Sequence, residues 1–229
     1  GELDKAIAAW QRALALAPEQ PFVKQMLEVL RGTRADCDAR LKLIRLLVDQ
    51  RLFDPAAQEC ARLLTETAPS DAQRAAVWLL QAEIAVGRNQ PAEALRLLGL
   101  LRVRGAEGVD SGALDVWEGI AKLRAGGTSV AEGLVLLENV RKLPRENPAV
   151  AIAEYELAVF QLGQGVTPQR AEELAAWLAA HPTDRRAAAA APVLLSAYLT
   201  LARQAGAPGP QAEPGAWDLK AKSLLEQLA

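Results

Sequence analysis

The hydrophobic positions along the chain follow the period of an α-helix in one segment after another. In residues 3–17 the apolar side chains recur at intervals of three and four residues, as Leu3, Ala6, Ile7, Trp10, Ala13 and Leu14. This spacing places them on one face of a helix, and Pro18 ends that helix because proline donates no backbone hydrogen bond. No segment alternates with a period of two over the length of a strand. The pattern therefore predicts an all-α chain.

The same pattern predicts about twelve helices joined by short connections. Their predicted ranges are 3–17, 21–31, 36–50, 54–67, 71–86, 91–103, 112–125, 129–142, 148–163, 168–180, 184–204 and 217–228. Capping residues mark several of the starts. Ser70 with Gln73 predicts a capping box, and Asp54 and Thr167 each precede a proline at the first helical position.

Bulky residues recur along the chain with a nearly constant period. Trp78, Trp117 and Tyr155 lie near the middle of the first helices of successive pairs, 39 and 38 residues apart. A period of this length with two helices per unit is typical of a solenoid, in which each unit packs on its neighbours. We expect Trp78 and Trp117 to pack between neighbouring helices. The helix near residues 21–31 is one more than this pairing accommodates.

This pattern resembles the tetratricopeptide repeat. The resemblance covers residues 1–205 and implies a right-handed α-solenoid of stacked antiparallel helix hairpins. The period of 38 to 39 residues exceeds the usual 34 of that family. The residues at family spacing are Gly1, Ala6, Trp10, Ala13 and Pro18 in the first stretch, Trp78, Ala82, Ala94 and Leu98 in the third repeat, and Trp117, Ala121 and Leu137 in the fourth.

The end of the chain differs from the repeats. Residues 206–216 are rich in proline and glycine and predict a linker. Residues 217–229 predict a final amphipathic helix that caps the open end of the array. Because the chain starts without Met and in the middle of a repeat, we expect it to be a fragment. The sequence leaves the compartment open between cytoplasm and periplasm.

Charge and hydropathy narrow the classes of partner. The formal net charge of −2 gives no overall electrostatic reason to bind nucleic acid. The stretch 31–51 holds six Arg or Lys against three Asp, but only Phe53 nearby could stack on a base. No apolar run approaches the ~20 residues that cross a bilayer. We therefore expect no nucleic-acid binding and no direct membrane insertion.

The side chains that usually carry catalysis or bind metals are scarce. The single histidine, His181, precedes Pro182 at a repeat junction, and the only cysteines are Cys37 and Cys60. A catalytic histidine needs a neighbouring nucleophile, and a zinc site needs several Cys or His ligands. On antiparallel helices the two cysteines would lie too far apart along the axis for a disulfide. We expect free thiols, no catalytic activity, no cofactor and no metal.

The family resemblance also implies a concave groove lined by the first helices. The positions that would line it are Glu83, Asp115, Glu118, Lys122, Glu156 and Phe160. Four acidic residues against one lysine favour a ligand that carries Lys or Arg, although the same residues also fit an ordinary solvated surface. An acidic C-terminal tail is not expected, because no asparagine lies at the positions with which that family binds one.

Together these patterns predict a non-catalytic protein–protein interaction scaffold that binds a peptide or a protein, with a basic partner favoured. The alternative left open is an oligomerisation or spacer arm of a larger envelope-assembly or enzyme-containing protein. In that alternative the chain would work through self-association, as a homo-oligomer.

Overall fold

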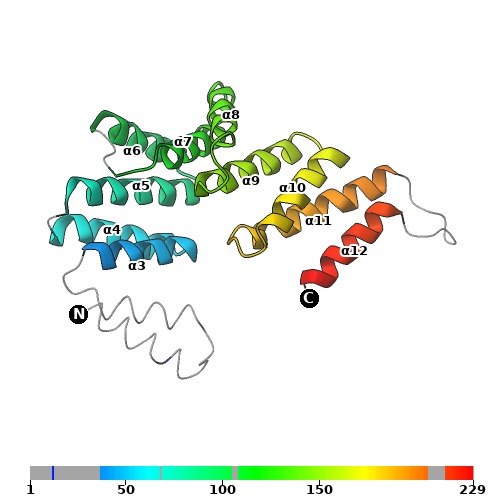
Figure 1. Cartoon of the computed structure of the whole chain (residues 1–229), viewed down its shortest axis with the longest axis horizontal. Helices are drawn as coiled ribbons and strands as arrows, with labels where there is room; N and C mark the ends of the chain where they lie inside the picture. Colours follow the sequence, from blue (N-terminus) through cyan, green and yellow to red (C-terminus); the bar gives the residue numbers. More distant parts are fainter. Residues whose placement is uncertain (1–11, 13–36, 68, 105–107, 206–214, 229) are drawn as a thin grey trace. The chain divides into compact units, whose positions relative to one another are not determined.

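The structure is a computed structural model that describes residue 12 and residues 37–67, 69–104, 108–205 and 215–228. In these residues it contains ten α-helices and no strand, which confirms the all-α prediction (Figure 1). The helices are α3 (Cys37–Asp49), α4 (Phe53–Glu66), α5 (Asp71–Gly87), α6 (Pro91–Arg104), α7 (Ser111–Ala125), α8 (Ser129–Val140), α9 (Pro148–Gly163), α10 (Pro168–Ala180), α11 (Ala187–Gln204) and α12 (Ala216–Leu228).

Each described helix lies close to a range predicted from the sequence. The largest difference is at the start of α11, which begins at Ala187 because a turn precedes it. In that turn Asp184 donates its backbone N–H to the carbonyl of His181, and its carboxylate accepts the N–H of Arg186 at 2.7 Å. The predicted helices 3–17 and 21–31 and most of the predicted linker lie outside the described residues.

Two of the predicted helix caps are confirmed and one is corrected. The Ser70 hydroxyl accepts the backbone N–H of Gln73, whose side chain accepts the N–H of Ser70. Thr167 caps α10 by accepting a backbone N–H in the same way. The prediction for Asp54 is wrong, because α4 already begins at Phe53. Asp54 lies in the first turn and forms an ion pair with Arg88 instead.

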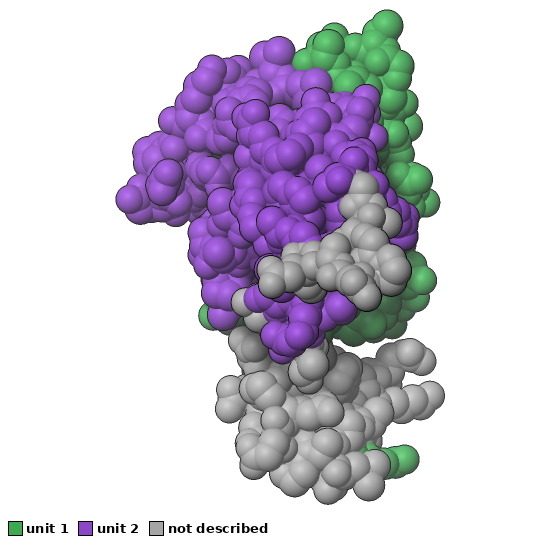
Figure 2. Space-filling view, turned by 90° about the vertical axis from the view of Figure 1, so that its right-hand side faces the viewer, with its two compact units in different colours: residues 1–133 green, residues 134–229 purple. Residues whose placement is uncertain are grey.

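The chain divides into two compact units, Gly1–Gly133 and Leu134–Ala229 (Figure 2). In unit 1, α3 contacts α4 and α5, α5 contacts α6 and α7, and α6 contacts α7. Its core includes the fully enclosed side chains of Ile44, Cys60, Leu63 and Val77. Each helix of this unit therefore buries its apolar stripe against its neighbours along the chain.

Unit 2 repeats this arrangement with its own core. Here α9 contacts α10 and α11, α10 contacts α11, and α11 contacts α12. Leu174, Trp177 and Tyr198 are buried in its core, and α12 adds Ala221 and Leu224. The predicted extents of the array, linker and capping helix stay predictions, but α12 does pack on α11.

The two tryptophans expected to pack between neighbouring helices differ in burial. Trp117 is buried, as expected. Trp78 is only half-buried, and the guanidinium of Arg104 lies 5.3 Å from the centre of its ring. A cation over an indole face is favourable, so Arg104 at the end of α6 stabilises the half-buried ring of Trp78. No helix in the described residues has the length and hydropathy needed to cross a membrane.

One glycine is required where α7 and α8 approach each other closely. A Cβ atom added to Gly133 would lie 2.7 Å from the carbonyl oxygen of Gly119 and 3.1 Å from the backbone N of Leu123. Backbone atoms cannot move aside as a side chain can, so the two helices would have to separate. Gly99 on α6 is a matched contrast, because a Cβ there would have no neighbour within 4 Å.

We expect Gly133→Ala to lower the free energy of unfolding by about 1–3 kcal/mol, because overpacking outweighs the helix propensity of alanine. Gly99→Ala should raise it by about 0.5–1 kcal/mol through propensity alone. Urea denaturation followed by circular dichroism measures both. Equal stabilisation by the two substitutions would contradict the close approach of α7 and α8.

Candidate interaction groove

Three of the residues predicted to line a groove form one ion-pair network on α7. Arg102 of α6 donates to Asp115 at 2.5 Å and to Glu118 at 2.7 Å. Lys122 lies 3.2 Å from Glu118 and donates to Glu132 of α8 at 2.6 Å. Ion pairs therefore connect the stripe of Asp115, Glu118 and Lys122 on α7 to α6 and α8. These two are the second helices of their pairs.

The oppositely charged groups of this network shift one another's pKa values. The hydrogen bond to Asp115 raises the pKa of the Arg102 guanidinium. The hydrogen bond between Lys122 and Glu132 raises the pKa of the lysine and lowers the pKa of the carboxyl group. Each shift means that the charged form is favoured by its partner. The acidic groups on α7 thus have basic partners within the chain.

The other predicted groove residues lie elsewhere. Glu83 of α5 is only 2% exposed, and its carboxylate accepts a hydrogen bond from Nη1 of Arg45 on α3 at 2.6 Å. Glu156 and Phe160 are half-buried on α9 in unit 2, and Glu156 is already engaged with another group of the protein. Within unit 1 the structure brings the three α7 residues together, and Glu83 lies with Arg45 of α3 instead.

A groove of about 680 Å³ lies beside Arg45, along α3, α5 and the segment that leads into α7. We call it the α3–α5 groove. Most of its surface is apolar, which suits it to side chains that leave water on binding. Its lining residues are Leu41, Lys42, Arg45, Leu46 and Asp49 from α3, Ala76, Leu79 and Leu80 from α5, and Gly108, Val109, Asp110 and Ala113 at the start of α7.

The charged residues of this groove differ in what they already contact. Asp110 caps α7, since its Oδ1 accepts the backbone N–H of Ala113 at 2.9 Å, and Asp49 is engaged with another group of the protein. Lys42 is exposed and has no partner within the described part of the chain. Arg45 contributes one N–H to Glu83, and its side chain remains 44% exposed. In the described residues, Lys42 and Arg45 therefore still have hydrogen-bond donors available at the rim.

The helical period explains how α3 supplies so much of the groove. Lys42, Arg45 and Asp49 are three and four residues apart, so that they follow one another along one side of the helix. Leu41 and Leu46 flank this line and also pack against the core of unit 1. The sequence pattern of residues 31–51 gave these charges only as a weak candidate for nucleic-acid binding. The helical spacing shows that the three charged residues share one face of α3. It does not show that α5 lies beside that face.

Unit 2 contains two further hollows. One of about 430 Å³ lies between α9 and α10, beside the buried Trp177. Another of about 710 Å³ is lined by α10, α11 and α12, and an ion pair between Lys220 and Glu172 joins α12 to α10 beside it. Lys220 also lies 4.8 Å from the ring of Trp217. Neither hollow is lined by the first helices of successive pairs, as the α3–α5 groove is by α3 and α5.

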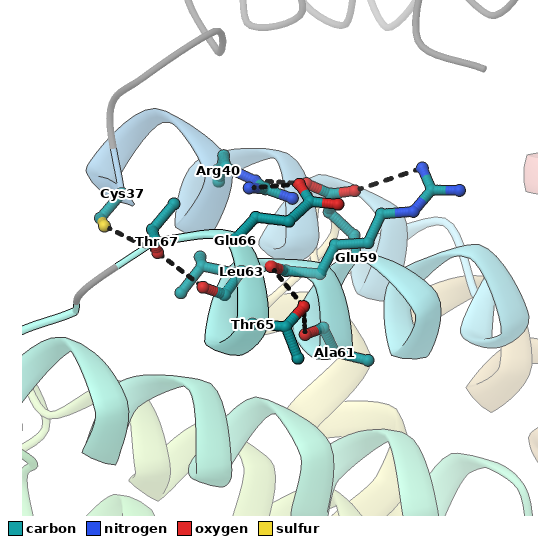
Figure 3. Close-up of polar contacts among 9 residues, drawn as sticks. Cys37, Arg40, Glu59, Ala61, Leu63, Thr65, Glu66 and Thr67 are labelled. Atoms are coloured by element: carbon teal, nitrogen blue, oxygen red, sulfur yellow. Dashed lines mark hydrogen bonds and ion pairs between the residues drawn. The ribbon is translucent and has the colours of Figure 1, made fainter. Parts of the chain in front are cut away.

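A partly buried polar cluster joins α3 to α4 (Figure 3). Arg40 donates from Nε to Glu59 at 2.6 Å and from Nη1 to Glu66 at 3.2 Å. Beside it, the Cys37 thiol donates to the Thr67 hydroxyl at 3.3 Å. Every buried side-chain nitrogen and oxygen in the described residues has a hydrogen-bond partner. The partners in this cluster are the chain's own groups, which indicates a role in packing α3 on α4.

Both cysteines are free thiols, as the sequence predicted, with Cys60 buried and Cys37 half-buried. Burial raises the pKa of the Cys60 thiol to about 12, so the group is protonated at neutral pH. A protonated thiol is a poor nucleophile, which indicates that Cys60 is a packing residue. His181 follows the last turn of α10, and its ring lies 5.2 Å from that of Trp177.

No group of three or more His, Cys, Asp or Glu side chains lies together as metal ligands would, within the residues described by the structure. The chain matches no protein-family model, no curated protein and no solved structure. The resemblance to tetratricopeptide repeats therefore stays a prediction, and the case for a function depends on the helix packing and the groove.

Proposed function

We propose that this chain is a non-catalytic protein-interaction scaffold whose α3–α5 groove binds a peptide segment of a partner protein. We also propose that each unit is a stretch of right-handed solenoid built from antiparallel helix hairpins. The order of contacts supports the solenoid. In unit 1 the first helices contact in succession, α3 with α5 and α5 with α7, and in unit 2 α9 contacts α11. Such stacking gives a continuous surface of first helices.

The groove supports the proposed binding through its position and its chemistry. It lies on the first helices α3 and α5, where a stacked array presents a surface to a ligand. Its apolar lining can receive bulky side chains, and its polar rim can orient a backbone or a charged group. The acidic residues first predicted to bind a basic partner already have partners within the chain. The proposal therefore places the binding site on α3 and α5.

The experiment uses random peptides displayed on phage and selected on the purified protein. Leu79 is half-buried in the groove lining, and Leu79→Asp puts a charge where an apolar ligand side chain would lie. We expect this substitution to weaken the selected peptides at least about tenfold, because a buried ligand side chain contributes about 1.5–3 kcal/mol. Fluorescence anisotropy with synthetic copies of the peptides measures the change in Kd.

The matched control is Val103→Asp on α6, since Val103 is 86% exposed and does not line the groove. Both substitutions add one negative charge, so a general electrostatic effect would appear in both. Peptides whose affinity falls with Leu79→Asp and not with Val103→Asp support the proposal. Selected peptides that are indifferent to Leu79, or sensitive to both changes alike, contradict it.

A further inference from the structure

The contact between Arg45 and Glu83 has a feature that a simple surface ion pair lacks. The carboxylate of Glu83 is 2% exposed beneath the groove, whereas the side chain of Arg45 is 44% exposed on its rim. A flexible arginine loses conformational freedom when it binds a ligand, and a fixed one has already lost it. The buried carboxylate of Glu83 therefore restricts the orientation of the Arg45 guanidinium.

Among the described residues, only one nitrogen of that guanidinium has a hydrogen-bond partner. Nη1 donates to Glu83, while Nε and Nη2 have no partner in the described residues. Nε and Nη2 are the two nitrogens from which arginine binds both oxygens of a carboxylate at once. Arg45 is thus oriented by one carboxylate and still has N–H groups available for a second.

Lys42 lies one helical turn before Arg45 on the same side of α3 and adds a second cation, which has no partner among the residues that the structure describes. Asp49 and Asp110 keep their negative charges in the groove, but both are already engaged within the protein, Asp110 through the backbone N–H of Ala113. Next to the cations the lining is apolar, with Leu41, Leu46 and Leu79 among its residues. A complementary ligand has a carboxylate beside a bulky apolar group.

We infer that the α3–α5 groove recognises an internal acidic side chain, Asp or Glu, that stands next to a bulky apolar residue in the partner's peptide. Arg45 and Lys42 bind the carboxylate, and Glu83 is a positioning residue that orients Arg45. This inference rests on the proposed function, because it names the ligand of the same groove. The inferred ligand is acidic, whereas the acidic residues predicted to line a groove favoured a basic partner.

The first test is the sequence of the selected peptides that depend on Leu79. We expect them to contain Asp or Glu beside a bulky apolar residue, and replacing that acid with Gln or Asn should weaken Kd about tenfold. Lys42→Glu should weaken the acidic peptide about threefold to tenfold. The same variant should bind a peptide with Lys in place of the acid more tightly than the unaltered protein does.

Arg45 needs a paired substitution, because Arg45→Gln alone would remove a charged hydrogen bond from the buried carboxylate of Glu83. The double variant Arg45→Gln with Glu83→Gln keeps the side chains near their original size and removes both charges. We expect it to fold and to bind the acidic peptide about tenfold more weakly. A neutral version of the peptide should bind this variant and the unaltered protein equally well.

The control for net charge is Arg96→Glu on α6, because the only partner of Arg96 among the described residues is Glu93, outside the groove. It changes the charge of the protein as much as Lys42→Glu does, and Kd should stay the same. Leu79-dependent peptides without an acidic residue, or a Kd indifferent to Lys42 and to the double variant, would overturn this inference alone. Failure to select any Leu79-dependent peptide would overturn the groove, and this inference with it.

Discussion

Replacing Trp177 with alanine is expected to lower the free energy of unfolding by about 3–5 kcal/mol. Trp177 is 4% exposed in the core of unit 2. Its indole Nε1 donates to the carbonyl of Ala151 on α9 at 2.8 Å, and its ring centre lies 5.0 Å from that of Tyr155. The side chain therefore joins α10 to α9 through apolar contact, aromatic contact and one hydrogen bond.

Two further variants separate these contributions. Trp177→Phe keeps an aromatic ring but cannot donate to Ala151, so it should lose only part of the stability lost by Trp177→Ala. Trp217→Ala on α12 removes the same kind of side chain from a half-buried site and should cost less than Trp177→Ala. Urea denaturation measures all three. A loss below about 1 kcal/mol for Trp177→Ala would contradict its role in the core.

Replacing Arg40 with alanine is expected to cost about 3 kcal/mol, because it leaves the largely buried carboxylate of Glu59 with only the longer contact to Arg62, at 4.0 Å, among the ion pairs of the described residues. The side chains of Arg40 and Glu59 are only 9% and 14% exposed, and their atoms approach to 2.6 Å. The second partner, Glu66, is 59% exposed and should contribute little. Most of the expected loss in the free energy of unfolding therefore comes from the desolvated carboxylate of Glu59.

The matched test removes both charges of that pair. Arg40→Met combined with Glu59→Leu fills the same space with apolar groups, and such exchanges are often neutral or stabilising. The double variant should therefore be more stable than Arg40→Ala when both are unfolded in urea. A double variant at least as unstable as the single one would mean that the ion pair itself, rather than the desolvated charge, stabilises α3 on α4.

The sequence predicted the described helices well because local signals set their ends. The capping box at Ser70 and the proline after Thr167 involve residues within one turn, so the chain itself shows them. Where a helix began without such a signal, as α4 does at Leu52 and Phe53, the prediction shifted to Asp54. Local hydrogen bonding thus explains both the agreement and the error.

The candidate site was harder to predict because distant residues decide what each charge contacts. Glu83 is buried by Arg45, which lies 38 residues earlier in the chain. Asp115 meets Arg102 because of the packing of α6 on α7, which the apolar pattern does not specify. A count of acidic residues treats these groups as open to solvent. Their partners can be identified only when the neighbouring helix is in place.

Peptide binding in the α3–α5 groove is tested most directly by nuclear magnetic resonance. The protein is titrated with a Leu79-dependent peptide, and the backbone amide and leucine methyl signals are followed. If the peptide binds in the α3–α5 groove, the largest shifts will occur at residues that line it, including Leu46, Ala76 and Leu79. Shifts concentrated on the stripe of Asp115 and Glu118, or in unit 2, would contradict it.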